Sequence, residues 1–201
     1  SSVIAIGAII LQVALNNLGA LPVAAYAATQ KIDAVAVMPM LSFGYAMAAY
    51  TAQNYGAQKY ERIRMGVRAC LRMSMAFAMG IGALLIAFGT FFLELFVGAD
   101  AAGAEEVIAY GHTYLVVTGS TYTILALLLV YRNVLQGLGQ SVIPTIAGVM
   151  ELIMRAVAAI FLCSSLGFLG ACMAYPLAWI GAAIPVTIAY FWTEKTLRQT
   201  V

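Results

Sequence analysis

The chain has 201 residues, of which 64% are hydrophobic and only 9% charged, and its net charge is +2. A soluble domain carries roughly 25% charged residues, and a soluble core of this length could not bury so much apolar surface, so the composition indicates an integral membrane protein. The small net charge argues against nucleic-acid binding. The three cysteines, odd in number and placed in or beside apolar segments, suit neither a disulfide framework nor a zinc site.

Six apolar stretches are each long enough, at roughly 20 residues, to cross a bilayer as a helix. Between the first two lie Lys31 and Asp33, which we expect on the outer side, solvated or locally paired. The basic stretch QNYGAQKYERIRMGVR after the second predicts a connection with an interfacial helical segment. The predicted spans cover residues 1–21, 34–52, 69–96, 107–131, 141–162 and 171–192.

Three prolines lie inside predicted spans, at Pro39, Pro176 and Pro185. Each removes a backbone hydrogen bond and favours a kink. They are compatible with ordinary bundle packing and also with helices that bend during transport. Ser1 opens directly into apolar sequence without a charged leader, so we expect the chain to be cut from a longer protein.

Basic residues are distributed unevenly across these spans, with eight of the ten on one side. Lys31 lies on the other side and Arg155 lies inside the fifth span. Because positive residues favour cytoplasmic loops, the loops near 54–68 and 132–140 and the C-terminus are predicted to be cytoplasmic, in a multi-pass protein of the cell's inner (plasma) membrane. The eight residues are Lys59, Arg62, Arg64, Arg68, Arg72, Arg132, Lys195 and Arg198.

Glu151 and Arg155 are charged residues placed deep in an apolar span. Glu151 lies ten residues beyond Ser141, roughly 15 Å along a helix that rises about 1.5 Å per residue, and it is the only carboxylate we expect at that depth. Charged groups there face the bundle interior or a hydrated cavity. The i, i+4 spacing allows an ion pair. The pair either fixes the helix orientation, or Glu151 titrates or binds a cation while Arg155 modulates it.

Other polar side chains within the spans are candidates for the lining of a hydrated substrate cavity. Hydroxyl groups can instead bond to their own helix, and amides can bond to a neighbouring helix. Tyrosine ring faces suit an organic cation. The candidates are Gln12, Asn16, Tyr45, Thr118, Thr121 and Tyr122.

Enzyme signatures are absent from the sequence. There is no GxSxG, HExxH or Walker loop, and one histidine with eight carboxylates offers little catalytic equipment. We therefore expect a protein that is not an enzyme, with no metal site and no cofactor.

Three segments carry a family resemblance: AAYAATQKID, MPMLSFGYAMAAYTAQNYGAQKYERIRMGVR and YRNVLQGLGQSVIPTIAGVMELIMR. Together they resemble the MATE family of multidrug and toxic compound extrusion transporters, matching the C-terminal six-helix lobe. The resemblance implies an all-α integral membrane fold, with residues 1–201 forming a six-transmembrane-helix bundle. That bundle is one lobe of a twelve-helix pseudo-symmetric antiporter, and the N-terminal lobe is absent from the chain.

The resemblance also implies antiport by alternating access, in which a Na⁺ or H⁺ gradient drives export of amphipathic or cationic drugs. The implied partners are the lipid bilayer, the missing N-terminal lobe and small organic cations. NorM-type members carry coupling carboxylates in the seventh and tenth helices, but the first and fourth spans here contain no Asp or Glu. Coupling is therefore expected at Glu151 or wholly in the other lobe.

Three other functions fit parts of the pattern. A lipid-linked saccharide flippase of the same superfamily would share the lobe but needs a more cationic cavity, and only Arg155 is expected to be deep. A channel would need a selectivity constriction, and the sequence shows no re-entrant segment that could form one. A scaffold would transport nothing.

Overall fold

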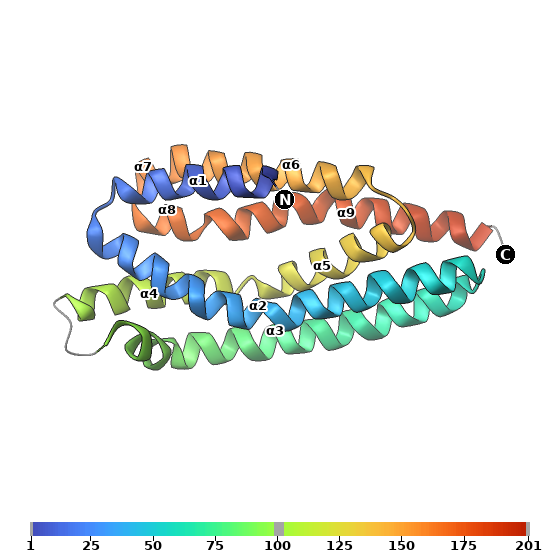
Figure 1. Ribbon diagram of the computed structural model, residues 1–201, viewed down its shortest axis with the longest axis horizontal. Coiled ribbons are helices and arrows are strands. Elements are labelled where there is room, and N and C mark those ends of the chain that lie inside the picture. Colours follow the sequence, from blue (N-terminus) through green and yellow to red (C-terminus); the bar gives the residue numbers. More distant parts are fainter. Residues whose placement is uncertain (1, 99–102, 200–201) are drawn as a thin grey trace.

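A computed structural model describes residues 2–98 and 103–199 (Figure 1). The predicted first residue of the first span and the last two residues of the predicted C-terminal tail lie outside this part. Helices account for nearly all of the described chain, and no strand occurs within it. They are α1 (Ser2–Asn16), α2 (Ala20–Gly56), α3 (Tyr60–Val97), α4 (Ala104–Gly119), α5 (Tyr122–Gly137), α6 (Val142–Val157), the π-helix η1 (Ala158–Leu162), α7 (Cys163–Leu166), α8 (Phe168–Cys172) and α9 (Ala174–Gln199).

The all-α membrane fold class is confirmed. Four helical segments are long and apolar enough to cross a bilayer by themselves, and α4 with α5 make a fifth when the bent pair is taken as one span. The first helix is shorter: its apolar part, Ile6–Asn16, is below the length of a full span. The six predicted spans therefore stay a prediction, although their order along the chain agrees with that of these helices.

The second and third spans are much longer than predicted. α2 begins at Ala20 and not near residue 34, because the Ala-rich stretch before Asp33 holds only Pro22, which a helix tolerates in its first turn. α3 begins at Tyr60, so the predicted interfacial segment is the first turns of this long helix. The connection between them is three residues, 57–59, with Gln58 at φ 57°.

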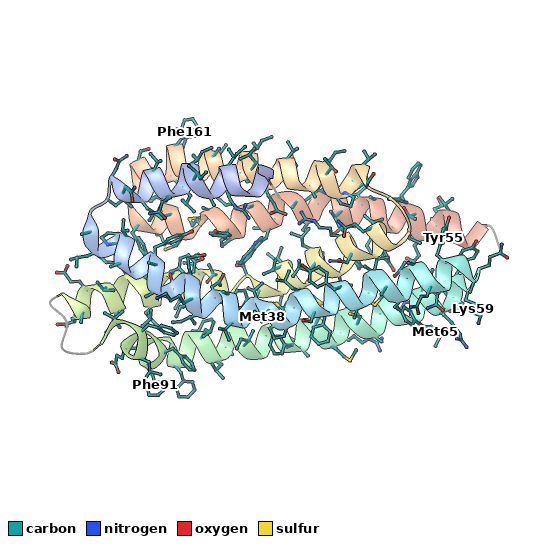
Figure 2. All side chains as sticks on the ribbon, in the orientation of Figure 1. Met38, Tyr55, Lys59, Met65, Phe91 and Phe161 are labelled. Carbon is teal, nitrogen blue, oxygen red and sulfur yellow. The ribbon has the colours of Figure 1, made fainter. Side chains whose placement is uncertain are left out.

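The helices form two groups that lie side by side along the long axis. α1, α6 and α9 run along one side of Figure 1, and α2, α3, α4 and α5 run along the other. Side chains fill the space between the groups, whereas Phe91 and Phe161 point away from the bundle (Figure 2). The two groups therefore enclose an interior and leave apolar faces outside.

One end of the lobe carries most of the basic side chains, and we call it the basic end. There α2 passes into α3, α5 passes into α6, and α9 finishes (Figure 1). Lys59, Arg62 and Lys195 are exposed at this end. The arrangement agrees with the loop grouping predicted from charge, and its cytoplasmic location stays a prediction.

The sharpest break in a span occurs without a proline. α4 and α5 meet at an angle of 49° at Ser120 and Thr121. The hydroxyls of these two residues donate to the carbonyl oxygens of Val117 and Thr118, which satisfies acceptors at the break. Pro39 and Pro185, in contrast, lie inside continuous helices.

Close packing of two glycines fixes α3 against this break. A Cβ on Gly82 would overlap the carbonyl oxygen of Gly119, a backbone atom that cannot rotate away. Small residues allow this backbone approach in lipid. The break is thus held by packing from α3 as well as by its own hydroxyls.

We expect Gly82→Ala to lower the stability of the folded lobe by about 1–3 kcal/mol, the usual cost of overpacking. Gly80→Ala is the matched control, since a Cβ at Gly80 meets nothing within 4 Å. Thermal unfolding midpoints in one detergent compare the two. Equal midpoints would contradict the tight α3–α4 contact.

Candidate coupling site in the polar interior

The structure separates the predicted site residues into two sets. Thr118, Tyr122, Glu151 and Arg155 are buried, and Thr121 is half-buried. The other three are on exposed faces: Gln12, Asn16 and Tyr45. The predicted cavity residues therefore do not meet in one cavity inside this lobe.

The predicted ion pair between Glu151 and Arg155 is confirmed. Arg155 Nη2 lies 3.2 Å from Glu151 Oε2, one helical turn away on α6, and both side chains are almost fully buried. The rest of this helix face consists of Pro144 and Ala147, so the polar pair continues a buried stripe. Residues at i and i+4 share one face, which is why the spacing found this contact.

Arg132 corrects one of the sequence predictions. We counted it in an inner loop, but α5 continues to Gly137, and Arg132 Nη2 donates to Glu151 Oε1 from that helix. Its side chain is 16% exposed. The long arginine side chain reaches inward from near the helix end, so Glu151 is shared by two guanidinium groups.

The charge balance around Glu151 is positive, with two guanidinium groups and one carboxylate. Arg155 Nε and Nη1 and Arg132 Nε are buried without a hydrogen-bond partner among the described residues. The Arg155 guanidinium carbon also lies 4.8 Å from the centre of the Tyr175 ring, a cation–π contact. Glu151 is thus heavily neutralised by its neighbours.

Asp33 is a second buried carboxylate, and the prediction that it is solvated or locally paired is wrong. It is 9% exposed, whereas Lys31 two residues earlier is exposed. The hydroxyl of Tyr122 donates to Asp33 Oδ1. In the part of the chain that the structure describes, no Lys, Arg or His forms an ion pair with Asp33. Glu151 is therefore not the only deep carboxylate.

A signal for the burial of Asp33 was present in the sequence. Thr29, Asp33, Ala36 and Met40 recur at helical spacing, and all are buried on one face of α2. Only the assumption that the second span begins near residue 34 hid this periodicity.

Tyr122 is the predicted cavity residue that reaches the carboxylate. It is the first residue of α5, directly after the break from α4, and it is fully buried. Its ring lies 6.1 Å from that of Trp179 on α9. The hydrogen bond from Tyr122 thereby joins Asp33 on α2 to the start of α5, which is bent relative to α4.

Ring contacts connect Tyr122 with the Glu151 cluster across the two helix groups, since the Trp179 ring centroid lies 6.1 Å from those of both Tyr122 and Tyr175. Gln30 Nε2 donates to the Tyr114 hydroxyl at 2.8 Å, and the Tyr114 ring lies edge-on to Tyr26 with centroids 5.7 Å apart. The Tyr26 hydroxyl donates to that of Tyr175 at 3.4 Å, and Tyr175 lies under Arg155. Gln30, Tyr114 and Tyr26 thus reach the Glu151 cluster through Tyr175, by a mixture of hydrogen bonds and ring contacts.

The remaining candidates have local partners. Thr118 donates to the Tyr114 carbonyl oxygen on its own helix. Gln12 Nε2 donates to Asn16 Oδ1 at 3.0 Å on the exposed face of α1, and Tyr45 is 66% exposed on α2. Within the described residues no group of three His, Cys, Asp or Glu side chains could hold a metal ion.

The chain was compared with known proteins. Residues 2–162 match the family described as MatE. A curated relative, the probable multidrug resistance protein YoeA of Bacillus subtilis (strain 168), is 21% identical over 193 residues, which are 93% of this chain and 40% of that protein.

Solved structures share the fold at low sequence identity. A MATE protein in complex with MaL6 superposes with a TM-score of 0.88 at 16% identity, covering 98% of this chain and 44% of that one. A MOP superfamily transporter from Pyrococcus furiosus, described as having a binding pocket of reverse polarity, gives a TM-score of 0.85 at 16% identity, with 98% and 44% covered. The chain thus spans less than half the length of these relatives.

Proposed function

The chain belongs to the MatE family of transporters, and from that premise we propose that it is one lobe of a proton-coupled exporter of amphipathic organic cations. Asp33 is the coupling carboxylate in this proposal, and Tyr122 is its partner. The supporting observation is the burial of Asp33 without an ion-pair partner among the described residues.

Burial makes the charge state of Asp33 consequential. An ionised carboxylate in a membrane interior costs several kcal/mol unless it is paired or hydrated, so loss of its charge stabilises this arrangement. A proton removes the charge directly. Hard cations bind to several oxygen ligands at once, whereas among the described residues the side-chain hydrogen bond to Asp33 comes from the Tyr122 hydroxyl and no group of three His, Cys, Asp or Glu could hold a metal ion, which favours H⁺ over Na⁺.

Because of the break between α4 and α5, a change in the charge of Asp33 can alter the arrangement of the helices. Tyr122 begins α5, so its bond to Asp33 ties α2 to the segment after the 49° bend. Ionisation of Asp33 draws in water or a cationic substrate and favours a second helix arrangement. Proton and drug then weaken each other's binding by linkage.

The exposed polar residues suit a substrate cavity between two lobes. Gln12, Asn16 and Tyr45 lie on outer faces of α1 and α2, where a second lobe would cover them. We propose that this second lobe makes up the rest of the transporter, as the partial coverage of the relatives suggests. The plasma membrane and a cytoplasmic basic end belong to the same proposal.

Glu151 has a structural role in this proposal. Its two oxygens are each bound by a different arginine, and a carboxylate held this way has little reason to release or accept a coupling ion. We infer that it fastens α5 to α6, so the ion-coupling role expected for Glu151 and Arg155 passes to Asp33.

An anionic cargo, such as a lipid-linked saccharide, is the second candidate. The observation in its favour is that Arg132 joins Arg155 inside the lobe, so the interior is more cationic than the sequence indicated. Cationic dyes would then move poorly and a pyrophosphate-linked lipid would be flipped.

Transport by vesicles that contain the protein expressed from its complete gene tests the proposal. Efflux of a lipophilic cationic dye is measured under an imposed pH gradient and, separately, under an imposed Na⁺ gradient. The proposal expects efflux with the pH gradient alone. Efflux driven only by Na⁺ would reject proton coupling, and no gradient-driven movement of several such dyes would reject drug export.

A further inference from the structure

A cavity lies at the basic end, away from the Asp33 network. It measures about 220 Å³, well above the space that one water molecule needs. The start of α3, the end of α5 and the end of α9 enclose it. Its lining residues are Tyr60, Glu61, Ile63, Arg64, Val134, Leu138, Tyr190, Glu194 and Leu197.

The walls of this cavity combine an apolar floor with charges of both signs. Ile63, Val134 and Tyr190 are buried, while Glu61, Arg64 and Glu194 supply two carboxylates and one guanidinium. A site with both signs at close range fits a ligand that itself carries both signs. A purely anionic ligand would meet two carboxylates.

Arg64 has donor capacity that its salt bridge does not use. Its Nη2 lies 2.7 Å from Glu61 on the preceding turn of α3. Its Nε is buried and has no hydrogen-bond partner among the described residues. A guanidinium presents donors in a fixed fork that suits phosphate. Because Nε is closed to solvent, the terminal nitrogens of this side chain, which is 26% exposed and lines the cavity, are the donors that a ligand can reach.

Aromatic side chains beside the cavity suit a position at the depth of lipid headgroups. Tyr60 and Tyr190 line it, and Trp192, two residues after Tyr190, is 76% exposed. Tyr and Trp collect at membrane interfaces. Exposed basic residues Arg62 and Lys195 flank the same region.

We propose that this cavity binds the headgroup of a phosphatidylethanolamine-type lipid. The ammonium donates to Glu194 and Glu61, the phosphate accepts from Arg64, and the glycerol and first acyl carbons lie against Leu138 and Leu197. A choline headgroup has no N–H to donate to the carboxylates, and a glycerol headgroup has no cation for them. The bound lipid clamps α3, α5 and α9 together.

Native mass spectrometry of the protein as encoded tests this site. The protein is equilibrated in micelles with equal amounts of dioleoyl phosphatidylethanolamine, phosphatidylcholine and phosphatidylglycerol. Phosphatidylethanolamine should be retained about tenfold over phosphatidylcholine, because charge-assisted hydrogen bonds distinguish them. Water-soluble glycerophosphoethanolamine in excess should compete only in part, since it lacks the acyl chains.

Variants assign the preference to this cavity. Glu194→Gln and Arg64→Lys should each remove most of the preference for phosphatidylethanolamine. Arg64→Lys keeps a positive charge beside Glu61 but lacks the planar guanidinium fork of arginine. Arg72→Gln, two turns further along α3 and outside the lining, is the control and should keep it. Unfolding midpoints show that each variant is folded.

Three results would overturn the proposal: equal retention of the ethanolamine and choline lipids, a preference for phosphatidylglycerol, or a preference that survives Glu194→Gln and Arg64→Lys. Because the readout is bound lipid and not transport, its failure leaves the Asp33 proposal untouched.

Discussion

Asp33→Asn should abolish the dependence of dye efflux on a pH gradient, while the protein remains folded and binds dye more weakly than the parent does. Asparagine can accept a hydrogen bond from the Tyr122 hydroxyl as Asp33 does, but it carries no charge and exchanges no proton. It therefore resembles the protonated state permanently. Gradient-driven efflux in vesicles should fall to the level seen without a gradient, while dye exchange at equilibrium continues.

Glu94→Gln is the matched control for this prediction, since Glu94 is an exposed carboxylate on α3. It should leave gradient-driven efflux unchanged. Tyr122→Phe keeps the carboxylate but removes its donor, so it should retain coupling with a shifted pH profile. If Asp33→Asn transports dye against the gradient as well as the parent does, the coupling role of Asp33 is wrong.

Glu151→Gln should be far more destabilising than Arg155→Met, although the two residues form one ion pair. Removal of Glu151 leaves one buried and one half-buried guanidinium group without their shared carboxylate, and breaking a buried pair in this way costs about 3–5 kcal/mol. Arg155→Met leaves Glu151 paired with Arg132 and also removes two unpartnered donors. Its cost should be clearly smaller.

Unfolding midpoints of the single and double variants compare the stability costs of the two substitutions. Adding Arg155→Met to Glu151→Gln should recover part of the lost stability, because one uncompensated cation disappears, and the recovery measures the coupling between them. Equal costs for the two single variants, or a larger cost for Arg155→Met, would contradict the shared-carboxylate arrangement.

Sequence periodicity found the parts of the site that lie within one helix. The i, i+4 spacing of Glu151 and Arg155 was sufficient to predict their contact. Contacts between helices depend on how far each helix extends and which face it turns inward. Arg132 was placed in a loop because α5 was expected to end at residue 131, one residue before it.

Asp33 also shows that the sequence does not reveal which face of a helix turns inward. A charged residue beside Lys31 was assigned to a polar connection, although α2 continues through it and turns Asp33 inward and Lys31 outward. The hydropathy minimum marks where charge occurs, and only the helical phase decides which charge is buried. The sequence marks its partner Tyr122 as a candidate for the cavity lining, but the pairing across 89 residues needed the structure.

Proton release on substrate binding tests the central claim most directly. The purified protein in weak buffer is titrated with a lipophilic cation while a pH indicator follows free protons. If Asp33 is the coupling group, binding should release about one proton per bound cation by linkage, and Asp33→Asn should release none. Release that persists undiminished in Asp33→Asn, or no release from the parent protein, would contradict it.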